Sequence, residues 1–110
     1  MSPSSDETGI FPLARFRIED RSMAPSMAPG DFVIVNRWSY KLGKPAQGDV
    51  VVLRDPENPG GHLVKRIASL ATSGGYFVVG DNLEASRDSR AFGPIAKDRI
   101  VGRVWRHVKP

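Results

Sequence analysis

Apolar and polar residues alternate along residues 13–19 of the chain. Phe16 and Ile18 fall on one face of an extended segment, and the charged residues around them fall on the other. A repeat of two residues with one apolar face predicts a β-strand that packs against a core. Pro25 and Pro29 follow, and they exclude a continuing central strand.

Short apolar runs bounded by glycine, proline and aspartate recur along the rest of the chain. A loop sequence, DPENPGG, fills residues 55–61, and no segment repeats apolar residues at helical spacing. The pattern predicts a mainly β domain of short antiparallel strands over residues 11–110, after a disordered polar leader over residues 1–10. The further expected strands cover residues 32–35, 50–53, 62–70, 76–79 and 100–108.

The composition narrows the available chemistry. With 110 residues, no cysteine and two histidines (His62 and His107, both expected at the surface), the chain predicts neither a metal site nor a cofactor. A formal charge of +4 mildly favours anionic partners, but a solvated basic surface is the preferred interpretation. We expect no nucleic-acid partner. No apolar stretch approaches the ~20 residues of a transmembrane segment, and the polar start of the chain is unlike a secretory signal. We therefore expect a soluble cytoplasmic protein, with weak peripheral association with membranes left open.

A lysine stands among apolar residues in the strand expected over residues 62–70. Leu63, Lys65 and Ile67 share one face of that strand, so the amine of Lys65 is a candidate for burial. Burial favours the neutral amine, and a neutral amine can accept a proton from a serine. The alternation alone favours the ordinary outcome, in which the lysine lies near an edge and reaches water.

Ser22 lies where the first strand breaks into a turn bounded by proline. We expect an exposed hydroxyl there, beside backbone N–H groups that are released from the strand ladder and can bind an oxyanion. A plain serine–proline turn is the other interpretation. Met23 is expected to line a pocket or, by default, to fill the core.

Two polar segments follow the strand expected over residues 76–79. The sequence GDN at residues 80–82 has the chemistry of a turn. The sequence SRDSR at residues 86–90 brings two hydroxyls and an Asp88–Arg90 pair, and its other interpretation is a solvated loop.

Together these segments resemble the type I signal peptidase family over residues 13–108. The resemblance implies a serine endopeptidase that uses a Ser-Lys dyad on a compact β-fold like that of signal peptidase and LexA. Longer members carry transmembrane helices and a large inserted β domain. Because this sequence contains neither, it is most similar to the small soluble nickel-type superoxide dismutase maturation proteases. The matching segments are Ser22-Met-Ala-Pro, Gly30-Asp31, Gly48-Asp49, Val64-Lys65-Arg66, Gly80-Asp81-Asn82 and Ser86-x-Asp88-Ser89-Arg90.

The resemblance assigns roles to individual residues. It implies that Ser22 is the nucleophile, that Lys65 is the general base and that Ser86 orients the lysine amine. It also implies that Asp88 and Arg90 form an ion pair that supports the site. The turn residues of the same support are Gly80, Asp81 and Asn82.

The resemblance leaves one position of the oxyanion hole in conflict with the sequence. The backbone N–H of Ser22 matches one donor, but the family usually has glycine or serine two residues earlier, where this chain has Asp20. An ionised carboxylate cannot donate a hydrogen bond, and it repels an oxyanion unless it points away. Asp20 therefore keeps a catalytically inactive family member among the alternatives.

The expected partner is a precursor protein that binds as an extended strand and loses an N-terminal propeptide or signal-like segment. The expected contacts come from Ile18, Met23, Pro25 and Leu63. The resemblance implies small side chains before the cut, and a nickel superoxide dismutase precursor is one candidate. The sequence makes no prediction of an oligomeric state.

Two other functions stay open. LexA-type self-cleaving domains share the Ser-Met-x-Pro and lysine elements, although residues 1–21 contain no Ala-Gly-like cleavage site. An inactive β-fold binding module is suggested by the net charge and by Trp38, Tyr40 and Trp105. Steep salt dependence of nucleic-acid binding, without proteolysis, would identify such a module.

Overall fold

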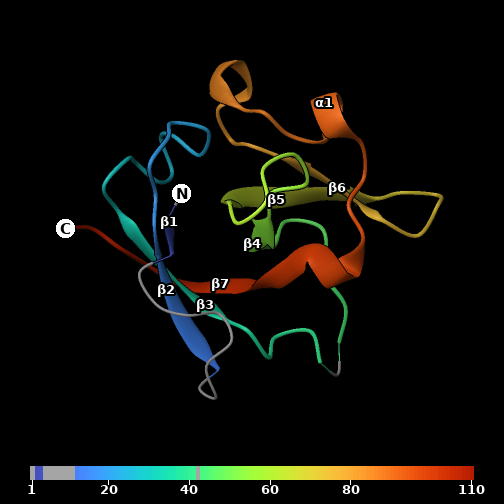
Figure 1. Ribbon diagram of the computed structural model, residues 1–110, viewed down its shortest axis with the longest axis horizontal. Helices are drawn as coiled ribbons and strands as arrows, with labels where there is room; N and C mark the ends of the chain where they lie inside the picture. The colour runs from blue at the N-terminus through green and yellow to red at the C-terminus, as the bar shows by residue number, and fades with distance from the viewer. Residues whose placement is uncertain (1, 4–11, 42) are drawn as a thin grey trace.

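The computed structural model describes residues 2–3, 12–41 and 43–110, and its strands form one sheet (Figure 1). Within these residues, seven antiparallel strands lie in the order β1-β2-β3-β7-β4-β5-β6, so the last strand in sequence inserts between β3 and β4. The strands are β1 (Ser2–Pro3), β2 (Leu13–Arg17), β3 (Phe32–Asn36), β4 (Val50–Arg54), β5 (His62–Leu70), β6 (Tyr76–Val79) and β7 (Ile100–Val108). The short helices are η1 (Leu83–Ala85), α1 (Ser89–Phe92) and η2 (Lys97–Arg99). Of the helices in the described part of the chain, none has the length and apolarity that a membrane crossing requires.

The expected mainly β fold of short antiparallel strands is confirmed. Strand β2 ends two residues before its expected end, because Ile18 already pairs with the turn ahead of β3 and donates its N–H to the carbonyl of Asp31 at 2.8 Å. The short helices were not expected, since three or four residues are too few to show a helical repeat. The leader expected over residues 1–10 lies outside the described residues, except for Ser2–Pro3 of β1.

Alternate strand residues build two hydrophobic cores on opposite faces of β4 and β5. Phe16 and Val52 lie in the first core, and Val51 and Leu53 lie in the second. Because β4 is covered on both faces, its sequence is an uninterrupted apolar run. Lys65 of β5 pairs with Val51, and it therefore points to the side of the second core.

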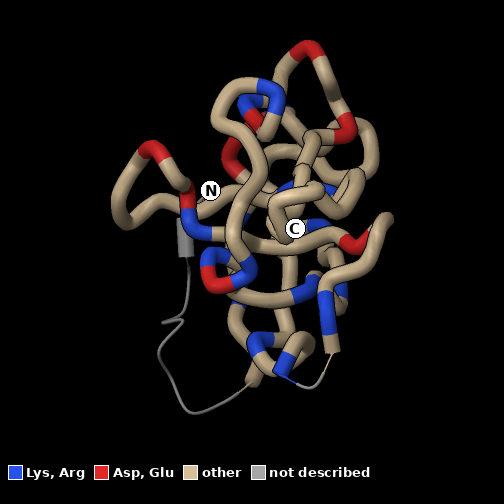
Figure 2. The backbone as a smooth tube through the Cα atoms, turned by 90° about the vertical axis from the view of Figure 1, so that its right-hand side faces the viewer, with Lys and Arg blue, Asp and Glu red and all other residues tan. Residues whose placement is uncertain are grey.

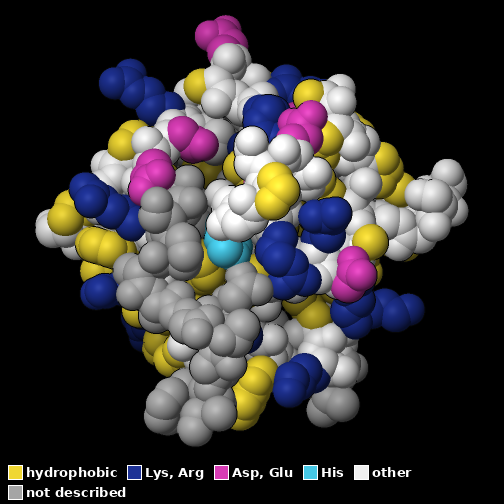
Figure 3. Space-filling view, in the orientation of Figure 1, with side chains coloured by type: hydrophobic (Ala, Val, Ile, Leu, Met, Phe, Trp, Pro, Cys, Tyr) yellow, Lys and Arg dark blue, Asp and Glu magenta, His cyan; other side chains and the backbone are white. Residues whose placement is uncertain are grey.

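The charged residues are distributed over several elements. Figure 2 shows Lys and Arg interspersed with Asp and Glu along the described chain. On the face seen in Figure 3, both kinds of charge are mixed with hydrophobic side chains. The formal charge of +4 is thus not carried by a single element in these views.

Gly102 of β7 provides a test of this packing. An added Cβ would lie 2.8 Å from the backbone carbon of Asn36 and 3.0 Å from Cα of Arg37. We expect Gly102→Ala to lower the free energy of unfolding by about 1–3 kcal/mol, because the neighbouring backbone must move. Urea unfolding measures the change. Gly43→Ala is the control, since a Cβ there meets nothing within 4 Å, and equal losses in both variants would contradict the prediction.

Candidate active site

The turn that carries Ser22 is anchored in the first core. Met23 is 1% exposed and packs into that core, and the N–H of Met27 closes the turn on the carbonyl of Met23 at 2.9 Å. Ser22 itself is only 3% exposed, so the expected exposed hydroxyl is wrong. The reason is a segment distant in sequence, because the N–H of Asn82 donates to the carbonyl of Ser22 at 2.8 Å and covers the turn.

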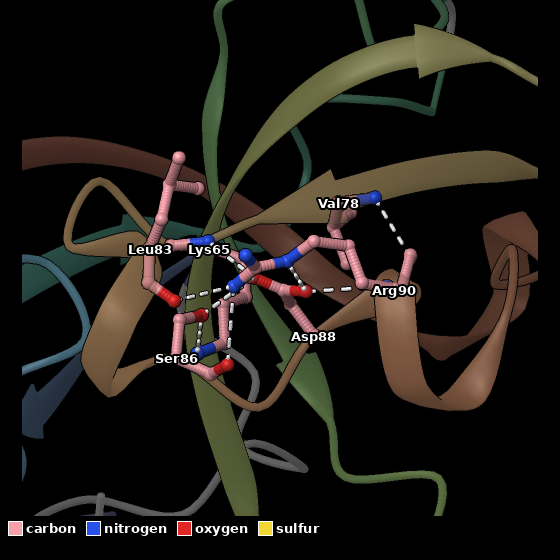
Figure 4. A network of polar contacts seen from close by, with 8 residues as sticks. Lys65, Val78, Leu83, Ser86, Asp88 and Arg90 are labelled. Carbon is pink, nitrogen blue, oxygen red and sulfur yellow. Dashed lines mark hydrogen bonds and ion pairs between the residues drawn. The ribbon is translucent and has the colours of Figure 1, made fainter.

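Lys65 is one of the most deeply buried residues of the described chain, at 1% exposure. The edge position favoured by alternation alone is therefore wrong. Residues 80–88, which we call the strap, leave the end of β6 and fold back over β5 (Figure 4). Within the strap, Ser86 accepts a hydrogen bond from Lys65 Nζ at 3.0 Å. The amine is thus held by a hydroxyl in a site largely closed to water.

Several charged groups act on Lys65, and burial dominates. Burial lowers the pKa of the Lys65 amine below its ordinary value. The negative charges of Asp20, Asp88 and Asp55 oppose this shift and raise the pKa, and the positive charge of Arg87 lowers it. The net effect favours the neutral amine, which is the form that can accept a proton.

Ser86 links Lys65 to a buried carboxylate (Figure 4). The Ser86 hydroxyl donates to Asp88 Oδ2 at 2.7 Å, and Asp88 also accepts the N–H of Gly80 at 3.0 Å and Nε of Arg90 at 2.9 Å. Burial alone would raise the pKa of Asp88, but hydrogen bonds from Arg90, Ser86 and Gly80 outweigh it and hold that pKa well below its usual range. The structure therefore brings Lys65, Ser86, Asp88 and Arg90 into one polar chain.

The first residues of the strap connect this network of polar contacts to the Ser22 turn. An added Cβ at Gly80 would lie 2.5 Å from the carbonyl oxygen of Ser22 and 2.6 Å from Cβ of Ser86, so both serines flank this glycine closely. Asp81 accepts two hydrogen bonds of 2.8 Å from the guanidinium of Arg66 and one of 2.7 Å from the Ser26 hydroxyl. Only glycine fits at position 80, where the strap passes the Ser22 carbonyl. The sequence predicted a turn there but not this close approach.

Asp20 points at Ser22. Its Oδ1 accepts both the backbone N–H of Ser22, at 3.0 Å, and the Ser22 hydroxyl, at 2.8 Å. The single hydroxyl proton of Ser22 is therefore directed at Asp20 and not at Lys65. Burial raises the pKa of Asp20, but the hydrogen bonds from Ser22 and the charge of Lys65 outweigh it, so its pKa is lowered overall.

The four residues expected to contact substrate are not the lining of one cavity. Ile18 and Met23 lie in the first core, Leu63 lies in the second core, and Pro25 is exposed. A surface hollow of about 530 Å³ lies elsewhere, between the segment after β3 and the middle of β7. The side chains of Ile18, Met23 and Leu63 are thus buried in the cores, and of the four residues only Pro25 is exposed.

Sequence reasoning missed contacts that depend on distant pairing. His62, expected at the surface, is 7% exposed, and its ring lies 5.0 Å from the ring of Phe16. Arg87 of the strap forms ion pairs with Asp55 and Glu57 in the loop after β4. The acidic and turn residues of that loop predicted a polar segment, but they did not predict that it pairs with Arg87.

Comparisons with known proteins bear on this arrangement. The sequence model of the family described as "Signal peptidase, peptidase S26" matches residues 8–73 and 71–108. The chain belongs to this family. The expected resemblance to the type I signal peptidases is thereby confirmed.

Similar proteins include membrane proteases and signal peptidases. A mitochondrial ATP-independent inner membrane protease subunit 1b of Arabidopsis thaliana is 36% identical, over 77% of this chain and 64% of that protein. The subunit 1a of the same plant is 33% identical, over 89% of this chain and 74% of that protein. Signal peptidase I of Pseudomonas aeruginosa is 28% identical, over 84% of this chain and 34% of that protein. The chain thus spans less than two thirds of the first relative's length and about a third of the bacterial one.

Asp88 provides a test of the polar chain under Lys65. Because the fold lowers its pKa, ionised Asp88 stabilises the protein at neutral pH, and this contribution is lost as the pH falls below the ordinary value of about 4. We expect Asp88→Asn to lower the free energy of unfolding at neutral pH by about 1.5–3 kcal/mol. The variant should then lose less additional stability than the parent between about pH 5 and pH 2.

Urea unfolding at a series of pH values measures both effects. Asp98→Asn, which removes an exposed carboxylate, is the matched control. An Asp88→Asn variant with the parent's pH dependence would show that Asp88 does not carry this contribution.

Proposed function

We propose that this domain is a serine endopeptidase in which Ser22 is the nucleophile and Lys65 is the general base. The observation that carries the proposal is the buried amine of Lys65, which bonds to Ser86, while Ser86 and the carbonyl of Ser22 both lie close against Gly80. An ammonium that is buried against a neutral hydroxyl is costly, so the surroundings of Lys65 favour the neutral base that a Ser-Lys dyad needs. Membership of the signal peptidase family supports the same chemistry.

The proposed reaction proceeds through an acyl-enzyme. Ser22 Oγ attacks the substrate carbonyl carbon while its proton passes to Lys65 Nζ, and the N–H of Ser22 donates to the resulting oxyanion. The Lys65 ammonium then gives this proton to the leaving amine, and the peptide bond breaks. Neutral Lys65 next takes a proton from water as the water oxygen attacks the ester carbon. The bond from that carbon to Ser22 Oγ then breaks, and the Lys65 ammonium returns the proton to Ser22 Oγ, which restores both residues.

Ser86 has a defined part in this cycle. The Ser86 hydroxyl accepts a hydrogen bond from the Lys65 amine and donates one to Asp88. These two bonds fix the direction of the Lys65 side chain. A fixed amine is placed for proton transfer without the entropy loss of ordering a flexible lysine. Before attack, the Ser22 hydroxyl must turn from Asp20 toward Lys65, a rearrangement that hydrogen bonds in a substrate-free site commonly require.

Two strand edges favour binding of an extended peptide. The main-chain pairs of β5 with β6 begin at Arg66, so the first half of β5 extends beyond the end of β6. The outer edge of β2 already accepts an extended segment, because β1 pairs with Arg17 and Phe16 there. The N–H and carbonyl of Ile18 face the opposite side, where they bond Asp31 and Gly30. We therefore place substrate hydrogen bonds on the neighbours of Ile18 and on the β5 segment near Leu63.

The proposed substrate is a precursor protein that loses an N-terminal segment. The names of the relatives, signal peptidase and inner membrane protease, support this class without naming a substrate for this chain. Removal of a propeptide from a nickel superoxide dismutase precursor and action as a soluble cytoplasmic enzyme stay predictions.

The dyad is tested by removing each member. We expect Ser22→Ala and Lys65→Ala each to reduce cleavage by about 10⁴-fold or more, and the double variant to be no worse than either single one, because the two residues act as a unit. Circular dichroism must show that the variants remain folded. Cleavage retained by a folded Ser22→Ala variant would exclude Ser22 as the nucleophile.

The substrates for this test are a nickel superoxide dismutase precursor and a signal-peptide-bearing preprotein in detergent. Mass spectrometry of the new N-termini identifies the cut. Cleavage of the preprotein alone would contradict the maturation-protease prediction and leave the serine endopeptidase proposal standing.

The pH dependence tests the role of Lys65. Because its neutral form is the base, activity should rise with pH through the lowered pKa of Lys65 and be lost in acid. Ser86→Ala removes one hydrogen bond to the amine, and we expect a rate about tenfold lower without complete loss. Initial rates across the pH range measure both. A rate that does not change from acid to alkaline pH would exclude a lysine base.

A further inference from the structure

Asp20 makes two contacts with the reacting residue of the proposed enzyme. Both the N–H and the hydroxyl of Ser22 donate to the same oxygen, Asp20 Oδ1, at 3.0 and 2.8 Å. Asp20 follows the buried Ile18 and the exposed Glu19 after the end of β2, and Asp20 itself is exposed. A carboxylate with access to water can leave Ser22 by rotation of its side chain, without movement of the core.

These two contacts involve the groups that the reaction needs. The N–H of the nucleophile is the donor nearest to the carbonyl oxygen of a bound substrate, and a carboxylate already occupies it. The hydroxyl proton that must pass to Lys65 is held by the same carboxylate. An ionised Asp20 left in this position would also repel the negative oxygen of the tetrahedral intermediate.

We infer that Asp20 is a latch: it holds Ser22 in a resting state by occupying both its N–H and its hydroxyl, and a substrate carbonyl must displace it before Ser22 can react. This inference rests on the proposed function of Ser22 and Lys65. Asp20 is not a proton acceptor in the reaction. It inhibits the free enzyme, and the binding of a substrate in the correct register opens the site.

The charge of Asp20 also acts on Lys65. The charge of Asp20 raises the pKa of Lys65, as Asp88 and Asp55 do, whereas Arg87 and burial lower it. Removal of the Asp20 charge therefore lowers the pKa of Lys65 further. The acid limb of the pH–rate profile then moves to lower pH.

The kinetic test compares Asp20→Asn with Asp98→Asn. Asparagine keeps the shape and can still accept the Ser22 N–H in the turn, but it carries no charge and offers an N–H to an oxyanion. We expect kcat/KM to rise about tenfold in Asp20→Asn, because a neutral amide accepts the two Ser22 hydrogen bonds more weakly than a carboxylate and does not repel the oxyanion, and we expect its acid limb at lower pH. Asp98→Asn makes the same change in net charge at an exposed position and should leave both quantities unchanged.

A second measurement does not depend on turnover. Ser22 Oγ can add to the boron atom of a peptide boronic acid that has alanine at the cleavage position, and the Ser22 proton then passes to Lys65. The product is a negatively charged boronate with an oxygen at the N–H of Ser22. We expect about tenfold tighter binding to Asp20→Asn, and ¹¹B NMR follows the adduct. In ¹⁵N-labelled parent protein, the amide proton of Ser22 should titrate with Asp20, and this titration should be absent from Asp20→Asn.

The outcomes separate the latch from the proposed function. Full cleavage by folded Ser22→Ala would overturn the proposed function and, with it, the latch. If Ser22→Ala is inactive but Asp20→Asn is slower than the parent, or its acid limb does not move, the latch alone is wrong. A Ser22 amide proton that does not respond to Asp20 overturns the latch without reference to any substrate.

Discussion

The structure depends on keeping the amine of Lys65 out of water. Transfer of an ammonium group into a closed site is unfavourable, so the fold must either neutralise it or surround it with partners. Here the immediate partner of the amine is the neutral hydroxyl of Ser86. That hydroxyl donates to the carboxylate of Asp88, which also accepts hydrogen bonds from Arg90 and Gly80. This order of groups places a neutral hydroxyl, and not a carboxylate, next to the amine, which keeps the neutral form accessible.

The strap (residues 80–88) meets this constraint and also positions the Ser22 turn. Its start binds the Ser22 turn through Asn82 and binds β5 through the Arg66–Asp81 pair. Its end brings Ser86 onto Lys65. One segment therefore sets the separation of both proposed catalytic groups. The close approach at Gly80 explains why this crossing has no room for a side chain.

The sequence predicted most strands because alternating segments, short apolar runs and the turn residues that bound them are local features of the chain. The positions of Lys65 and Ser22 were wrongly expected from local pattern, since their burial is imposed by residues 80–88, which lie far along the chain. Family resemblance placed the same residues in one site, but it carried no information on side-chain direction. Asp20 was recognised as chemically unusual, yet only its rotamer shows that it bonds Ser22.

Asp20 and Asp88 both favour the charged form of Lys65, but they act from different settings. The charge of Asp88 is shared with Arg90, and it is fixed by the buried network. Asp20 accepts hydrogen bonds from the N–H and the hydroxyl of Ser22, which are neutral donors. Its charge raises the pKa of Lys65 more than the charge of Asp88 does. When Asp20 swings into water, solvent screens its charge, so the pKa of Lys65 falls as the Ser22 hydroxyl is released. In the proposed latch, one side-chain rotation thus frees the nucleophile and strengthens the bias toward a neutral base at the same moment.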